Sequence, residues 1–139
     1  MIHLIDAFNL IYKFPDLEEH MYRGELEQAM GGLLARLREM RAALRAAGKG
    51  VPPLHVFFAG KRKRGDETRR LSLEGMELYY SHDLSADHLI QEFISRSAAP
   101  GDLKVISSDN KVRDFARVHR CQRETAEDFA AWLNEFLRS

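Results

Sequence analysis

Short, uninterrupted apolar runs alternate with amphipathic helical segments along this chain of 139 residues. The runs LHVFFA at 54–59 and LKVIS at 103–107 lack the alternation of a strand that has one wet face, and such strands are usually covered on both faces. Strands that alternate with helical periods are typical of βα units around a parallel sheet. The pattern therefore predicts an α/β fold, a three-layer α/β/α sandwich with a central, mostly parallel sheet.

The expected elements can be placed by their residue ranges. We expect about five strands, at residues 2–6, 54–59, 76–81, 103–107 and 120–123. We expect helices at residues 25–47, from Ser85 onward, at residues 110–118, and after Thr125. Residues 60–70 are expected to form a basic loop between the second and third strands.

The length suits one domain, and we expect residues 1–139 to form it. The single cysteine, Cys121, excludes an internal disulfide and a multi-cysteine zinc site, and it suits a reducing compartment. The first residues lack the basic start and long apolar stretch of a signal peptide. No window reaches the roughly 18 apolar residues of a membrane span. We therefore expect a cytoplasmic protein with no membrane contact.

Polar side chains follow three of the predicted strands. Asp6 and Asn9 follow the first strand, Ser85 and Asp87 open the helix after the third, and the segment 107–109 (Ser-Ser-Asp) ends the fourth. In open parallel sheets, ligands bind beyond the carboxyl ends of the strands, near the point where the strand order reverses. We therefore expect these side chains to converge at one edge of the sheet.

Each of these acids also has a purely structural interpretation. Asp87 lies in the first turn of a helix, Ser85 is a candidate N-cap, Asp109 could cap the next helix, and Asp6 could simply end a strand. A cluster of carboxylates, however, is repulsive unless a cation neutralises it. Mg²⁺ and Mn²⁺ take oxygen ligands and can activate water for phosphodiester hydrolysis. The three acids together therefore favour a divalent metal site.

The loop after the second strand carries six basic residues against two acidic ones. The basic residues are Lys61, Arg62, Lys63, Arg64, Arg69 and Arg70. Since the formal net charge of the chain is zero, any attraction for nucleic acid must be local. Such a run is often only a solvated loop. Its position at the same sheet edge as the acids favours a second interpretation, in which it grips phosphates without reading bases.

Three motifs resemble the NYN domains, a family of PIN-like nucleases. The segment 5–12 (IDAFNLIY) resembles the opening strand and Asp-x-x-Asn signature of that family. The segment 84–90 (LSADHLI) resembles its central Ser/Thr-Ala-Asp motif, and the segment 105–112 (VISSDNKV) its Ser-Ser-Asp motif. The order and spacing are most similar to the YacP-like branch, and the resemblance covers nearly the whole chain.

The resemblance implies a PIN-like sheet and a metal-dependent endoribonuclease. It implies a Mg²⁺ or Mn²⁺ site at Asp6, Asp87 and Asp109, with Asn9 and Ser108 orienting ligands or substrate. Ser85 and the basic loop would contact single-stranded or loop RNA. The chain departs from the family at Ala7, where we expect glycine. A fourth acid, common in PIN-like sites, has three candidates in this sequence: Asp83, Asp114 and Glu124.

Two further functions compete with the nuclease. One is a module of the same fold that binds RNA or the ribosome and cuts poorly, although a pure RNA binder has no use for clustered negative charge. The other is a phosphoacceptor receiver domain, which requires paired acids after the first strand and a lysine after the last; neither is present. The absence of GxxxxGK[ST] and GxGxxG disfavours a P-loop or dinucleotide-binding protein.

Overall fold

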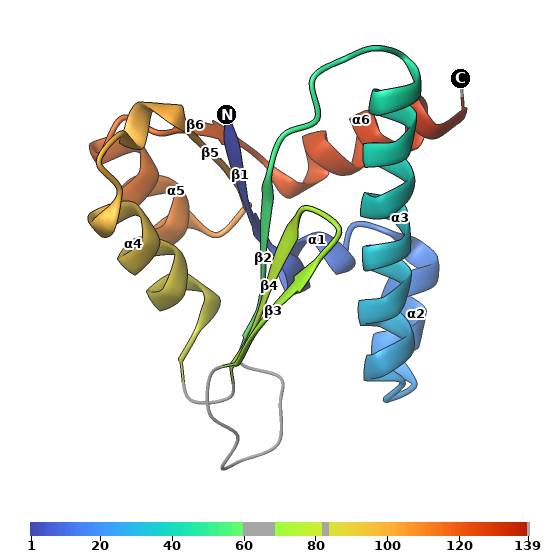
Figure 1. Ribbon diagram of the computed structural model, residues 1–139. Coiled ribbons are helices and arrows are strands. Elements are labelled where there is room, and N and C mark those ends of the chain that lie inside the picture. The colour runs from blue at the N-terminus through green and yellow to red at the C-terminus, as the bar shows by residue number, and fades with distance from the viewer. Residues whose placement is uncertain (60–68, 82–83, 139) are drawn as a thin grey trace.

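Six strands form one sheet in the computed structural model, in the order β3-β4-β2-β1-β5-β6, with helices on both faces (Figure 1). The structure describes residues 1–59, 69–81 and 84–138. The strands are β1 (Ile2–Asp6), β2 (Leu54–Ala59), β3 (Arg69–Leu73), β4 (Met76–Ser81), β5 (Leu103–Ile106) and β6 (Gln122–Glu124). The helices are α1 (Ala7–Ile11), α2 (Pro15–Tyr22), α3 (Leu26–Ala46), α4 (Ala86–Arg96), α5 (Asn110–Val118) and α6 (Ala126–Arg138), with a 3₁₀ turn at Pro100–Asp102.

The strand order reverses at β1, which lies between β2 and β5. Asp6 is in register with Phe57 of β2, and Ile5 with Ile106 of β5, and both pairings are parallel. The chain first builds β2 and β4 on one side of β1 and then crosses by α4 to place β5 and β6 on the other side. The carboxyl ends of β1 and β5 therefore flank the position where parallel sheets bind ligands.

Helices α1, α2, α3 and α6 cover one face of the sheet and enclose the larger core. The inner stripe of α3, which includes Leu33, Leu37 and Met40, is almost fully buried, as its spacing predicts. Pro15 occupies the first turn of α2, where its missing N–H costs nothing. Gly32 allows α2 to approach α3, because a Cβ at this position would lie 2.4 Å from Cδ2 of Leu17.

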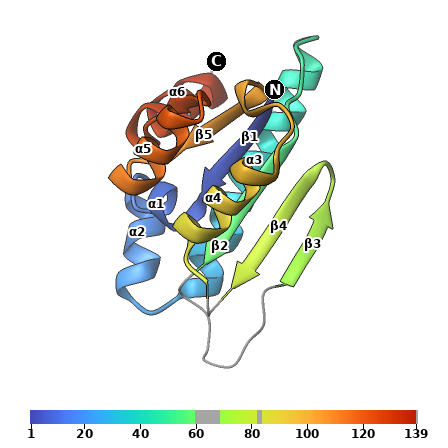
Figure 2. The same cartoon turned by 90° about the vertical axis from the view of Figure 1, so that its left-hand side faces the viewer.

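Helices α4 and α5 cover the opposite face with a second, smaller core. Leu4, Val105 and Phe57 contribute to it from the sheet, and Ile90 and Ile94 contribute from α4. Figure 2 shows α4 in front of the central strands and the β3–β4 hairpin standing beside it. No helix within the described part of the chain is long and apolar enough to cross a membrane.

The α/β fold and its mostly parallel sheet are confirmed, with one strand more than the expected number. The added strand is β3, an antiparallel edge strand that pairs with β4 and includes Arg69 and Arg70. These two residues were expected in the basic loop. Four of the five β3 residues are exposed, so the strand has no apolar pattern by which a sequence could reveal it.

Candidate active site

The site begins with a hydrogen bond between the ends of β1 and β5. The buried Ser107 hydroxyl donates to Oδ2 of Asp6 over 2.9 Å. Oγ of Ser107 also accepts a hydrogen bond from the backbone N–H of Asp109 over 3.0 Å. Asp6 is 8% exposed and Ser107 is fully buried. One serine thus connects two of the three predicted acids, which lie far apart in the sequence.

Asn9 and Ser108 form a second connection across the same edge. Oδ1 of Asn9, in the short helix α1, accepts from the backbone N–H of Ser108 over 2.7 Å. The Ser108 hydroxyl in turn accepts from the backbone N–H of Ala126, at the start of α6, over 2.9 Å. The described structure therefore brings Asp6, Asn9, Ser108 and Asp109 together, as the motifs predicted.

The carboxyl group of Asp6 is electrostatically strained. The pKa of Asp6 is raised to about 6, mainly by burial and in addition by the charges of Asp109 and Asp87. Hydrogen bonds from the Ser107 side chain and the Asn9 backbone oppose this rise in the pKa. Because both other acids act on Asp6, the three carboxylates share one electrostatic environment.

Asp87 and Ser85 lie at the start of α4. The Ser85 hydroxyl accepts from the backbone N–H of His88 over 3.0 Å, so Ser85 is the N-cap of this helix. The Asp87 carboxylate accepts a hydrogen bond from the side-chain amide of Gln91, one turn further along. Both residues thus have the structural role that the sequence allowed, and Asp87 also acts on Asp6 through its charge.

Asp109 caps α5 with one of its oxygens. Oδ1 accepts from the backbone N–H groups of Lys111 and Val112, over 2.8 and 3.3 Å. Within the described part of the chain, both cap bonds go to Oδ1 and neither goes to Oδ2. A carboxylate can cap a helix through one oxygen and bind a cation through the other, so the cap does not remove Asp109 from the site.

The donor chemistry of these acids fits a hard divalent cation. Three carboxylates supply the oxygen ligands that Mg²⁺ and Mn²⁺ prefer, and a cation among them would relieve the repulsion that raises the pKa of Asp6. The three carboxylates, however, lie further apart than the ligands of one metal ion do. Within residues 1–59, 69–81 and 84–138, no group of three or more His, Cys, Asp or Glu side chains is gathered closely enough to hold an ion.

The structure adds Glu127, a carboxylate that the sequence reasoning missed. Its Oε2 accepts from the Ser108 hydroxyl over 2.5 Å, and its Oε1 pairs with Nζ of Lys13 over 2.7 Å. Hydrogen bonds from Lys13 and Ser108 lower the pKa of Glu127 to about 2. Its place in the first turn of α6, two residues after Thr125, was the available signal.

The sequence offered three candidates for a fourth acid of the site, and the structure describes two of them. Glu124 pairs with Lys104 over 2.8 Å on β5. Asp114 is exposed on α5. Asp83 lies outside the described residues. Glu127 is therefore a better candidate than Glu124 or Asp114, since it is bonded to the serine next to Asp109.

The predicted RNA-binding residues fall into two groups. Lys61, Arg62, Lys63 and Arg64 lie outside the described residues. Arg69 and Arg70 lie on β3, three strand spacings from β1, which is roughly 14 Å across the sheet. Arg70 pairs with Glu77 over 3.3 Å, and its guanidinium lies over the Tyr79 ring.

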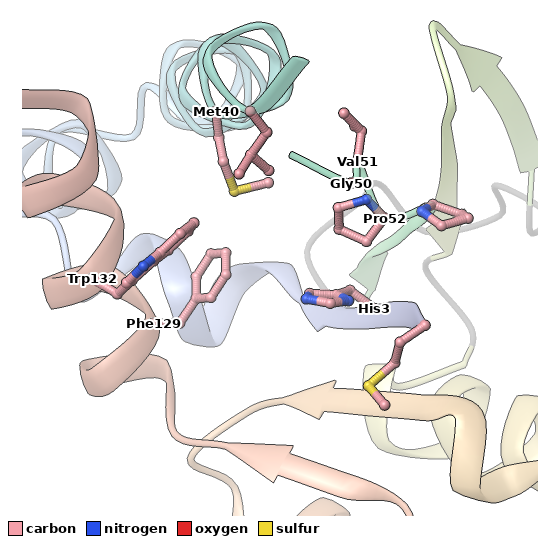
Figure 3. Close-up of a pocket in the computed structure, with 10 residues that line it drawn as sticks. His3, Met40, Gly50, Val51, Pro52, Phe129 and Trp132 are labelled. Atoms are coloured by element: carbon pink, nitrogen blue, oxygen red, sulfur yellow. The ribbon is translucent and has the colours of Figure 1, made fainter. Parts of the chain in front are cut away.

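A cavity of about 430 Å³ lies at the opposite edge of the molecule (Figure 3). It is mainly apolar and contains His3, Met40, Val51, Phe129 and Trp132, from the amino ends of β1 and β2 and from α3 and α6. Trp132 is 42% exposed. None of the described residues that line this cavity is an acid, and none belongs to the Asp6 cluster.

The family of the chain follows from comparison with known proteins. The model of the YacP-like NYN domain matches residues 3–138, so the chain belongs to that family. The fold is PIN-like, and the family places the chain among RNA-related nucleases.

Two solved structures of Rae1 (YacP) from Bacillus subtilis are similar to the chain. One has 20% identity and a TM-score of 0.68 and covers 99% of this chain and 76% of its own. The W164L mutant has 17% identity and a TM-score of 0.69, with coverages of 99% and 77%. No curated protein matches the chain.

Proposed function

We propose that this protein is a metal-dependent endoribonuclease that hydrolyses RNA phosphodiester bonds at the Asp6 cluster. The observation that carries the proposal is the buried carboxyl of Asp6, whose pKa is raised by burial and by the charges of Asp109 and Asp87. A fold gains no stability from placing buried and like-charged carboxylates together. Such a cost is typical of sites that bind a cation and do chemistry.

Asp6, Asp87 and Asp109 would hold Mg²⁺ or Mn²⁺, and Glu127 would add a further carboxylate beside Ser108. When bound, such an ion lowers the pKa of a water and stabilises charge on the leaving oxygen. The Ser107 hydroxyl fixes the orientation of Asp6, and Asn9 fixes the backbone of Ser108. Lys13 holds Glu127 in its ionised form. These contacts pre-organise the acidic edge for its ligand.

The proposed substrate is single-stranded or loop RNA in the cytoplasm. Family membership supports RNA. The basic segment from Lys61 to Arg64, together with Arg69, Arg70 and Ser85, would contact the phosphates of the substrate. Contacts of this kind position a strand without reading its sequence.

A second candidate is a module of the same fold that binds RNA or the ribosome and cuts poorly. One observation favours it: the acids of the described part of the chain are not gathered at the spacing of a single ion. This candidate predicts RNA binding that does not depend on a divalent metal.

The test is incubation of the pure protein with labelled single-stranded RNA and with DNA of the same sequence. Parallel reactions contain Mn²⁺, Mg²⁺ or EDTA. We expect RNA to be cut internally with either metal and to stay intact in EDTA. Undiminished cutting in EDTA would overturn the metal-dependent assignment, and binding without cutting in every reaction would favour the second candidate.

A further inference from the structure

Three arginines of α3 surround a pocket of about 420 Å³ next to the β3–β4 turn. Arg38, Arg41 and Arg45 line it from the helix, and Glu74 and Gly75 line it from the turn. Figure 1 shows this turn beside α3. Gly75 lies directly against the guanidinium of Arg41, because a Cβ on it would lie 2.2 Å from Nη2 of Arg41. The positive φ of 85° at Gly75 also requires glycine there.

Arg41 places a buried positive charge in the wall of this pocket. Its side chain donates a hydrogen bond to the carbonyl of Pro52, and the residue is 8% exposed. Burial lowers the pKa of Arg41, and the charge of Arg45 lowers it further. Among the residues that the structure describes, Arg41 has no carboxylate partner. A buried cation without an opposite charge is costly.

Glu74 is the one acid among the described lining residues, and Arg38 already binds it. Nε and Nη2 of Arg38 donate to the two oxygens of Glu74, over 3.0 and 3.3 Å. This bidentate pair leaves two arginine charges, those of Arg41 and Arg45, without a neutralising group in the pocket. Guanidinium groups bind phosphate well because their N–H groups match its oxygens.

Simpler roles exist for each arginine separately. Arg41 anchors the chain before β2 through Pro52, and Arg45 lies in the last turn of α3, where a cation complements the helix dipole. Neither role requires the two charges to line the same polar pocket. Nor does either explain why the acid in the pocket is bonded to the outer arginine, Arg38, while the buried one has no acid.

We propose that Arg41 and Arg45, with Arg38 at the rim, form a phosphate-binding pocket at the edge of the sheet opposite the candidate active site. The pocket lies at the amino end of β4, since Leu73 pairs with Met76 across the turn. The acids lie beyond the carboxyl ends of the strands, so the length of a six-residue strand, about 20 Å, separates the two sites. A phosphate of a distant part of a bound RNA and a free phosphate ion offer the same oxygens to these guanidinium groups.

Inorganic phosphate is the first probe. Thermal unfolding of the protein in EDTA is followed as phosphate replaces chloride at constant ionic strength. We expect the melting temperature to rise on the order of 5–10 °C at a hundredfold excess over Kd. Arg45→Gln should lose most of this rise. Arg45 is exposed, so this variant should fold normally. Glu74→Gln should reach half of the rise at a lower phosphate concentration, because it removes the repelling carboxylate.

The matched control is Arg117→Gln, which removes an exposed arginine from the last turn of α5. It should respond to phosphate as the wild type does. The proposal is wrong if phosphate leaves the melting temperature unchanged, or if all four proteins respond equally, which would mean that the anion binds elsewhere.

The second probe, single-stranded RNA long enough to span both sites, identifies the source of the phosphate. This arm rests on the proposed function, whereas the phosphate arm does not. Binding is measured in EDTA over a range of salt concentrations. If RNA occupies the pocket, Arg45→Gln should reduce the slope of log K against log salt by about 0.7, one single-strand phosphate contact, relative to Arg117→Gln. An unchanged slope, together with a lost phosphate response, assigns the pocket to free phosphate.

Discussion

The Ser107 hydroxyl donates a hydrogen bond to the carboxylate of Asp6 over 2.9 Å, although the two residues are 101 positions apart in the chain. The bond joins the carboxyl ends of β1 and β5, where the strand order reverses. It stabilises the ionised form of Asp6 and so opposes the effect of burial on its pKa. The site thus contains an acid that is held in one orientation and is costly to ionise.

The free-energy cost of ionising Asp6 in the folded state predicts a pH-dependent difference in stability between the wild type and Asp6→Asn. The pKa of Asp6 is about 6 in the folded protein, above its ordinary value of 3.8, so the folded state binds the proton more tightly. Well below pH 4 the carboxyl is protonated in both states and costs nothing. As the pH rises from 4 to 6 the folded state loses stability, on the order of 3 kcal/mol once ionisation is complete. Asparagine avoids this loss.

Urea unfolding in EDTA measures this difference. Relative to the wild type, Asp6→Asn should be more stable above pH 6 than it is at pH 4. The control is Asp114→Asn, which removes an exposed acid from α5. A stability difference between Asp6→Asn and the wild type that stays constant from pH 4 to 7.5 would show that Asp6 is not strained.

Glu127→Gln tests the acid that the structure adds. Glutamine keeps an oxygen for the Ser108 hydroxyl and loses the charge that pairs with Lys13. The stability loss should be under about 1 kcal/mol, because the Glu127 side chain is 54% exposed. RNA cutting should fall at least about tenfold if the carboxylate serves the site. Asp128→Asn, one residue further along the same helix, is the control, and equal rates in the two variants would exclude Glu127 from the site.

Asp87→Asn tests whether the start of α4 contributes to metal binding. A cation that binds only the folded state stabilises it by about 2.7 kcal/mol at a hundredfold excess over Kd. The wild type should therefore melt on the order of 5–10 °C higher in Mn²⁺ at constant ionic strength. Asp87→Asn should lose most of that increment, while Asp102→Asn, on the 3₁₀ turn, should retain it. Equal increments in wild type and Asp87→Asn would leave Asp87 with a structural role only.

The sequence predicts those helices and strands whose buried residues form a recognisable apolar pattern within a short segment. The apolar runs of β2 and β5 and the stripe of α3 are each visible in a short window, and all three lie where expected. The edge strand β3 cannot be recognised in a short window, because it is held to β4 by backbone hydrogen bonds and its side chains are mostly exposed. The order of the strands, which decides which ends meet, depends on contacts distant in the sequence.

The candidate active site also depends partly on local sequence patterns and partly on contacts between distant segments. Strand ends followed by acids predicted that Asp6, Asn9, Ser108 and Asp109 would meet, because parallel strands share a carboxyl edge. Glu127 could not be assigned in this way, since its bond to Ser108 depends on where α6 begins relative to β5. The distance between Asp87 and the other acids likewise depends on how α4 packs, which no local pattern encodes.

The rate of RNA cutting by Asp109→Asn, compared with Asp114→Asn on the same helix, tests the nuclease assignment most directly. Asparagine at 109 keeps an oxygen that can cap α5, so the fold should persist, as circular dichroism can verify. The proposed site predicts that Asp109→Asn cuts labelled RNA in Mn²⁺ at least about a hundredfold more slowly than the wild type, while Asp114→Asn cuts normally. Equal rates for all three proteins would contradict a catalytic site at Asp109.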